Sequence, residues 1–167
     1  MKPHQFKCVL TLVTCSALSA TACTTNEPAP PFDTNAHMAA WVNLWNTYDL
    51  SLVNDLFLTD STVTYFSSER EGLIVGIEAV RTHHEGFGFV SGGKVAEQEL
   101  WVDDVHTATH GATAIVTGVW FFGQRSETPE NVQRGPFTFV YVLSDGEYRL
   151  AHLNFGTYLE TPVGEDG

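Results

Sequence analysis

The sequence predicts a single α+β domain in which early helices cover the concave side of a curved antiparallel sheet. Large apolar residues recur at helical spacing just after the N-terminal region. The second half of the chain holds four long segments rich in Val, Thr, Tyr, Phe and Trp, whose alternating polarity is typical of half-buried strands. Residues 35–163 hold all these elements, and roughly 130 residues form one ordinary domain with one core.

The helical part begins with residues that can cap a helix. Residues 33–35 offer N-cap side chains, and Ser51 can cap a second, shorter helix. A third helix is predicted over about 77–84, ending near Gly86. The first helix is predicted from its apolar spacing, formed by Met38, Trp41, Val42, Leu44, Trp45 and Tyr48.

The predicted strands lie mostly after the third helix. One strand is expected earlier, over 62–66. Asp145-Gly146 is a tight hairpin signal, and His110-Gly111 is expected to turn another pair of strands. The four later strands are predicted over 94–106, 112–122, 136–143 and 148–158.

Four segments carry a resemblance to a known superfamily, namely 45–57, 60–65, the Gly76 region at 76–80, and the last strand at 148–154. In this order they resemble the nuclear transport factor 2-like superfamily, and SnoaL-like domains within it. The resemblance implies a cone, in which a strongly curved sheet wraps around helices and leaves an apolar cavity open at one end. It also implies a homodimer formed through the outer face of the sheet. A shared fold does not by itself establish a shared function.

The last strand supplies the first candidates for chemistry. A period of two places Tyr148, Leu150, His152 and Asn154 on one face. If this face lines the cone, His152 can act as an acid or base and Asn154 can donate to a developing oxyanion, with Tyr65 as a third catalytic group. The alternative is a structural His152, hydrogen-bonded to a neighbour within the sheet.

A second group of residues is expected to line the pocket, namely Trp45, Tyr48, His83, Trp120 and Tyr141. His83 and His84 point roughly 100° apart on a helix, so at most one of them can face the pocket. Tyr48-Asp49 resembles an early Tyr-Asp pair of scytalone dehydratase, but Asp49 can equally cap the turn between two helices. Ketosteroid isomerase chemistry is disfavoured, because Tyr65 aligns with the aspartate base of those enzymes.

Aromatic rows on the strands allow three interpretations, of which a core or a dimer interface is favoured over a ligand-binding site. Phe137, Phe139 and Tyr141 share one face of their strand, and Trp120 and Phe122 share one face of theirs. We expect no metal site, because His106 and His110 lack ligands at zinc-site spacing. The sequence also lacks a phosphate-binding loop and a nucleophile elbow, and we expect no cofactor.

The N-terminal region predicts export. Residues 1–22 combine two lysines with an apolar run of about 15 residues, too short to span a bilayer and typical of a cleaved signal. Small residues before Cys23 resemble a bacterial lipobox with Cys23 as the acylated residue, whereas Ala20-Thr21-Ala22 also fits ordinary signal peptidase. Residues 23–34 are then a proline-rich tether, and 164–167 a C-terminal tail. By the same resemblance, Thr24 favours the periplasmic face of the outer membrane.

The charge of the mature chain limits its possible binding partners, and its cysteine content limits its possible disulfides. Removing Lys2 and Lys7 with the signal leaves six basic residues against 20 acidic ones, a net charge near −14. Such a surface argues against nucleic acid as a partner. The three cysteines all lie at or before Cys23, so the mature domain has no internal disulfide. Two functions remain open: a pocket for a small apolar or aromatic molecule, with lyase-, isomerase- or cyclase-type acid–base chemistry, or a non-catalytic envelope module for dimerisation or protein interaction.

Overall fold

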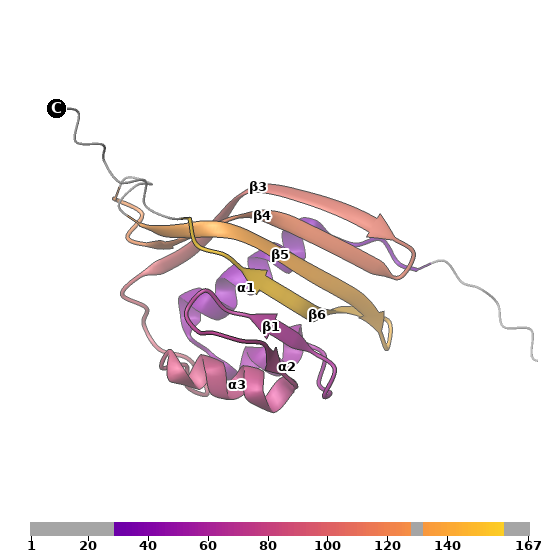
Figure 1. Ribbon diagram of the computed structural model, residues 1–167, viewed down its shortest axis with the longest axis horizontal. Coiled ribbons are helices and arrows are strands. Elements are labelled where there is room, and N and C mark those ends of the chain that lie inside the picture. The colour runs from indigo at the N-terminus through magenta and orange to yellow at the C-terminus, as the bar shows by residue number, and fades with distance from the viewer. Residues whose placement is uncertain (1–28, 128–131, 159–167) are drawn as a thin grey trace, which may run out of the picture.

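The computed structural model describes residues 29–127 and 132–158 (Figure 1). The predicted signal, Cys23, most of the tether and the C-terminal tail therefore lie outside the described residues. Within the described ranges, no helix is both long enough and apolar enough to cross a membrane. The described residues form three α-helices, one short 3₁₀ helix and a six-stranded sheet.

Helix α1, Thr34–Thr47, begins at the predicted capping residues. The Asp33 carboxylate caps it by accepting a hydrogen bond from the Ala36 amide at 3.1 Å. Tyr48 ends it in the left-handed conformation, with φ 52°. One stripe of the helix is buried against the sheet, formed by Met38, Trp41, Leu44 and Trp45.

The turn after α1 is organised by Asp49 rather than by Ser51. The Asp49 carboxylate caps the 3₁₀ helix Leu50–Leu52, accepting from the Ser51 amide at 2.9 Å and the Ser51 hydroxyl at 2.6 Å. It also accepts from the Gly92 amide at 3.0 Å, which ties a distant loop to this turn. These bonds, led by the one from the Ser51 hydroxyl, lower the pKa of Asp49. The prediction of Ser51 as the cap is wrong, and the capping role for Asp49 is confirmed.

The remaining helices are short and flank the first strands. Helix α2 is Val53–Leu56, and α3 is Ile77–Gly86, close to the predicted 77–84. Gly76 precedes α3 with φ 86°, a conformation that favours glycine.

The sheet has the strand order β2-β1-β6-β5-β4-β3. β1 lies parallel to β6, while every other neighbouring pair is antiparallel, so the sheet is mixed and the expectation of a purely antiparallel sheet is corrected. A parallel pair arises here because the chain crosses over between β1 and β6 instead of turning back in a hairpin. The strands are β1 Thr64–Phe66, β2 Ile74–Val75, β3 Glu99–His110, β4 Thr113–Gly123, β5 Gln133–Ser144 and β6 Glu147–Phe155.

The two predicted turns are confirmed. Asp145 and Gly146 both have positive φ, 52° and 85°, as a two-residue hairpin between β5 and β6 requires. Gly111, with φ 60°, turns β3 into β4. The strand boundaries shift, since β3 starts five residues after the predicted 94 and runs on to His110.

Two bulges interrupt the ladders. On β6, Val140 pairs with His152 but Tyr141 pairs with Leu150, so Ala151 is an extra residue without a partner on β5. On β3, the register shifts between Asp103 and His106, and Asp104 adopts φ 51°.

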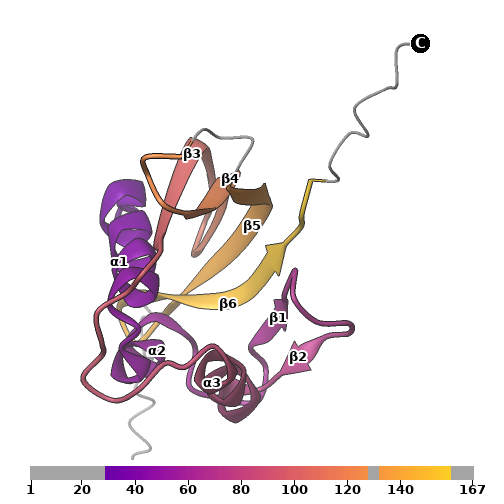
Figure 2. The same cartoon turned by 90° about the vertical axis from the view of Figure 1, so that its left-hand side faces the viewer.

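The helices lie on one side of the sheet, which curves around them, while the other face carries no helix (Figure 2). The core lies in this concavity and is continuous from the start of α1 to its end. Its largest fully buried side chains include Trp41, Tyr141, Phe57, Phe139 and His84. The aromatic row of β5 therefore belongs to the core, which is one of the interpretations that the sequence left open.

Candidate functional site

A cavity of about 190 Å³ opens at the end of the core where α1 ends. Its walls come from every layer of the domain: α1, the loop after β1, the end of α3, and strands β3 to β6. Aromatic rings dominate the walls. The lining residues are Trp45, Tyr48, Tyr65, Ser67, Ser68, Glu69, Phe87, Leu100, Trp120, Phe122, Gln133 and Phe155.

Packing and hydrogen bonds fix the deep wall of this cavity. Trp120 donates its indole N–H to the Gly156 carbonyl at 2.9 Å, which sets the orientation of the ring. Trp45 is 8% exposed and packs edge-on against Phe87 and Phe89, with ring centroids 5.3 and 5.2 Å away. The wall is thus built from rigid rings whose faces are held in place before any ligand arrives.

Polar groups gather on one side of the cavity, in the loop that follows β1. The Glu69 amide donates to the Ser67 hydroxyl at 3.1 Å, which folds residues 67–69 into a tight turn over the cavity. Gln133 adds an amide from the first residue of β5. Glu69 is exposed and is the one charged side chain among the lining residues at described positions.

Tyr65 is the one expected catalytic residue that lines the cavity. Its side chain is 2% exposed, and burial raises the pKa of its hydroxyl, with the nearby Glu69 charge acting in the same direction. The hydroxyl therefore stays protonated at neutral pH and can donate a hydrogen bond.

The two histidines of α3 lie behind Tyr65 and outside the lining of the cavity. His84 is fully buried, its Nδ1 donates to the Val80 carbonyl at 2.8 Å, and burial lowers its pKa to about 4. This bond fixes the neutral tautomer and leaves Nε2 as an acceptor with no partner among the described residues. His83 is half-buried and packs edge-on against Tyr65 at 5.2 Å, so its predicted place in the pocket lining is corrected.

Tyr141 is also corrected, because it lies at the other end of the core. It packs against Phe32 and His37, with ring centroids 5.0 and 4.9 Å away. Phe32 stacks on His37 at 4.4 Å, and Tyr148 closes the cluster and donates its hydroxyl to the Pro30 carbonyl. Residues 30–37 thus fill this end with their own side chains, and Tyr141 has no access to the cavity.

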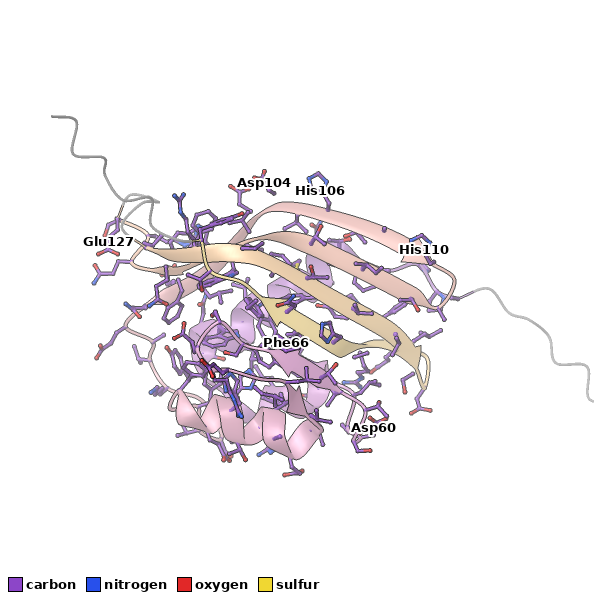
Figure 3. The ribbon with its side chains drawn as sticks, viewed as in Figure 1. Asp60, Phe66, Asp104, His106, His110 and Glu127 are labelled. Atoms are coloured by element: carbon purple, nitrogen blue, oxygen red, sulfur yellow. The ribbon has the colours of Figure 1, made fainter. Side chains whose placement is uncertain are left out.

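His152 and Asn154 lie on the outer face of the sheet, so their expected placement in the cavity is wrong. The Ala151 bulge reverses the alternation of β6 after Leu150, which turns Leu153 and Phe155 into the core instead. His152 Nδ1 lies 2.8 Å from the Thr64 hydroxyl on the parallel neighbour β1. Figure 3 marks Phe66, the next outward residue of β1, whose ring lies 6.2 Å from His152.

Several lining residues were not singled out from the sequence. Ser67, Ser68 and Glu69 belong to a loop, where no periodicity indicates direction. Phe87 follows α3, and Phe155 lies beyond the bulge that misleads the period of two. Only the alternation of β4, which places Phe122 with Trp120, could have identified one of them.

The described residues show no cluster of three or more His, Cys, Asp or Glu side chains suited to a metal ion. His106 and His110 both lie on β3, and in Figure 3 Asp104 and His106 project from that strand away from the helices. Neither histidine reaches the cavity lining.

Comparison with known proteins identifies the fold of the chain. No family model and no curated protein sequence matches the chain. Solved structures do match. A nuclear transport factor 2-like superfamily protein from Salmonella enterica is 17% identical over 79% of this chain and 93% of its own, with a TM-score of 0.61. The chain has the nuclear transport factor 2-like fold.

Two further structures with this fold show its range. A candidate dehydratase from Streptomyces avermitilis is 15% identical over 75% of this chain and 94% of its own, with a TM-score of 0.60. The association domain of CaMKII from C. elegans is 17% identical over 74% of this chain and 91% of its own, with a TM-score of 0.57. A candidate dehydratase and an association domain thus share this fold, so the fold by itself does not select a function for the chain.

Proposed function

We propose that the chain is a pocket protein that binds one small, largely apolar or aromatic molecule in the cavity beside Trp45 and Trp120. The observation that carries this is a preformed aromatic cavity with a polar group of residues on one side, the usual form of a small-molecule site. Its volume of about 190 Å³ is a little above that of the roughly 150 Å³ engineered cavity that admits benzene. The ligand is therefore about the size of one substituted ring.

Of the three residues predicted to be catalytic, Tyr65 alone lines this cavity, so acid–base chemistry by that set would have to use Tyr65. His152 lies on the far side of the sheet from the cavity, and Asn154 with it. A neutral, buried phenol is a proton donor rather than a base at neutral pH. We therefore propose binding as the primary function. If the protein also catalyses a lyase- or isomerase-type reaction through Tyr65, the Tyr65→Phe variant should lose that activity and still bind the ligand.

Calorimetric titration of the full chain with phenol and toluene tests the proposal. We expect saturable 1:1 binding of at least one compound. Phe122→Ala removes one wall of the cavity and should weaken that binding several-fold. His152→Ala is the matched control on the opposite sheet face and should leave it unchanged. Absence of saturable binding across a panel of one-ring compounds, with intact folding, would overturn the proposal.

A second candidate function, self-association, is favoured by the uncovered outer face of the sheet. On this face Trp101 and Phe121 stack at 5.3 Å. Val119 and Pro136 form the next outward pair, and Val140 lies farther along β5, opposite Ile115. Strands β3 to β6 span roughly 35 Å by 15–20 Å, close to the ~800 Å² per partner of a standard interface. Sedimentation of the full chain tests it: Val140→Glu should dissociate a dimer, and a wild type that remains monomeric would rule the dimer out.

We also propose that the protein works outside the cytoplasm, anchored through Cys23 at the periplasmic face of the outer membrane. The signal-like residues 1–22 and the small residues before Cys23 support this. Cys23→Ser should release the protein from washed membranes into the soluble periplasmic fraction. Equal membrane retention of the two proteins would contradict lipidation.

A further inference from the structure

Within the part of the chain that the structure describes, the cavity lining joins many aromatic rings to a single charge, which is negative. None of these described lining residues is Lys, Arg or His. A neutral hydrocarbon ligand needs no charge in its site, and a carboxylate ligand would be repelled by this one. The seven rings are those of Trp45, Tyr48, Tyr65, Phe87, Trp120, Phe122 and Phe155.

Aromatic rings attract cations as well as apolar groups. The face of each ring carries negative charge, and an ammonium group within about 6 Å of a ring centroid gains about 0.5 to 2 kcal/mol, more when it is desolvated. The rim of this cavity already holds one such pair, since Lys94 Nζ lies 4.7 Å from the centroid of Tyr48. Lys94 belongs to the adjoining shallow recess with Glu97, and not to the cavity lining.

Glu69 is placed to serve as the counter-charge. The ion pairs among the described residues are Arg125 with Glu99 and Arg149 with Glu147, so Glu69 is not engaged in one. The pKa of His83 is lowered by burial and, to a lesser extent, by the positive charge of Arg70, the neighbour of Glu69 in sequence. The net charge of −12 for the whole chain adds a field that concentrates small cations at the surface.

We propose that the natural occupant of this cavity is a small ammonium compound, quaternary or tertiary, with its methylated nitrogen against the rings and its charge facing Glu69. This inference rests on the proposed function, because it names the chemical class of the ligand for the same cavity. A trimethylammonium group is apolar on its surface and cationic at its centre, so it suits aromatic walls better than a primary amine, which would lose its hydration there.

A charged ligand and its uncharged isostere test the proposal. Choline and 3,3-dimethyl-1-butanol have the same shape and differ only by carbon in place of the charged nitrogen. Calorimetric titration of the full chain should show choline binding about tenfold more tightly than the isostere. Raising the ionic strength should weaken choline binding and leave the isostere unaffected.

Two substitutions in one loop locate the charge. Glu69→Gln should weaken choline binding several-fold and leave the isostere unchanged. Glu71→Gln is the matched control, because Glu71 is also exposed, lies two residues away and is absent from the cavity lining. Both side chains are at the surface, so neither substitution is expected to unfold the domain.

The outcomes separate this inference from the proposed function. Equal affinity for choline and the isostere, or equal effects of the two glutamine variants, would overturn the ammonium proposal while the cavity remains a binding site. Failure of choline, the isostere, phenol and toluene alike would remove the binding function itself.

Discussion

The two ends of the aromatic core are built from the same kinds of residue but finish differently. At the end where α1 begins, Phe32 and His37 from the N-terminal segment fill the space beside Tyr141. At the end where α1 stops, the comparable space beside Trp45 and Trp120 is hollow. We call these the closed end and the open end. The contrast teaches that aromatic content does not make a pocket; among the described residues, a pocket remains where no segment fills the end of the core.

The largest predicted difference between the two ends is in the free energy of unfolding that is lost when an aromatic side chain is removed. Tyr141→Ala at the closed end removes a side chain that is 1% exposed, and should cost about 3 to 5 kcal/mol in the free energy of unfolding. Phe122→Ala at the open end removes a half-buried ring that already borders a void, and should cost roughly 1 kcal/mol. Urea unfolding measures both. Equal losses would mean that the open end is packed as tightly as the closed one.

The next effect concerns acid pH. Folding lowers the pKa of His84 from 6.5 to about 4, so the folded state favours the neutral ring. The stability that this contributes is fully present above pH 6.5 and is lost as pH falls through that value toward 4, a total of roughly 3 kcal/mol. His37 at the closed end is less buried, and its pKa falls by burial against an opposing effect of Asp33.

Urea unfolding at pH 7.5 and pH 4.5 checks this difference. His84→Phe should remove most of the loss between the two pH values, whereas His37→Phe should preserve most of it. Carboxylates such as Asp49, whose pKa is lowered, lose their contribution only at more acid pH. A wild-type protein with the same stability at both pH values would contradict the buried, neutral His84.

The smallest effect on stability should come from plugging the open end. Ser67→Phe places a ring over the cavity, as Phe32 does at the closed end. The free energy of unfolding should change by less than about 1 kcal/mol, because surface-loop substitutions usually do, but binding of one-ring compounds should be lost. Ser91→Phe, on an exposed loop outside the lining, is the control and should bind normally. Unchanged binding in Ser67→Phe would place the ligand elsewhere.

The sequence predicted the fold better than the site, and β6 shows why. A period of two starting at Tyr148 correctly turns Leu150 inward, but the extra residue Ala151 reverses every later position. His152 therefore moved from the expected cavity to the outer face. The apolar residues of β6 change phase at the bulge, from Tyr148 and Leu150 to Leu153 and Phe155. A strict period of two assigns these two pairs to opposite faces, and only the pairing with β5 shows that both face the core.

The second feature that the sequence did not predict was which end of the core an inward-facing residue reaches. Alternation predicted that Tyr141 faces inward, and it does, with 1% exposure. Whether an inward residue meets a cavity or a plug depends on the segment around Phe32, which is distant in sequence. Trp45, Tyr65 and Trp120 each lie on a helix or strand whose local periodicity sets the direction of the side chain, and Tyr48 directly follows α1, so the sequence could place these four residues together.

The bulge on β3 has a consequence for how copies of this protein can meet. β3 is a sheet edge 12 residues long, and long bare edges invite pairing with other chains into aggregates. Asp103 and Asp104 place two acidic residues at this edge, and the left-handed turn at Asp104 breaks its regular run of hydrogen-bonding groups. The opposite edge, β2, is only two residues long. Growth of the sheet from chain to chain is therefore blocked at both sides, which leaves its broad face as the route to association.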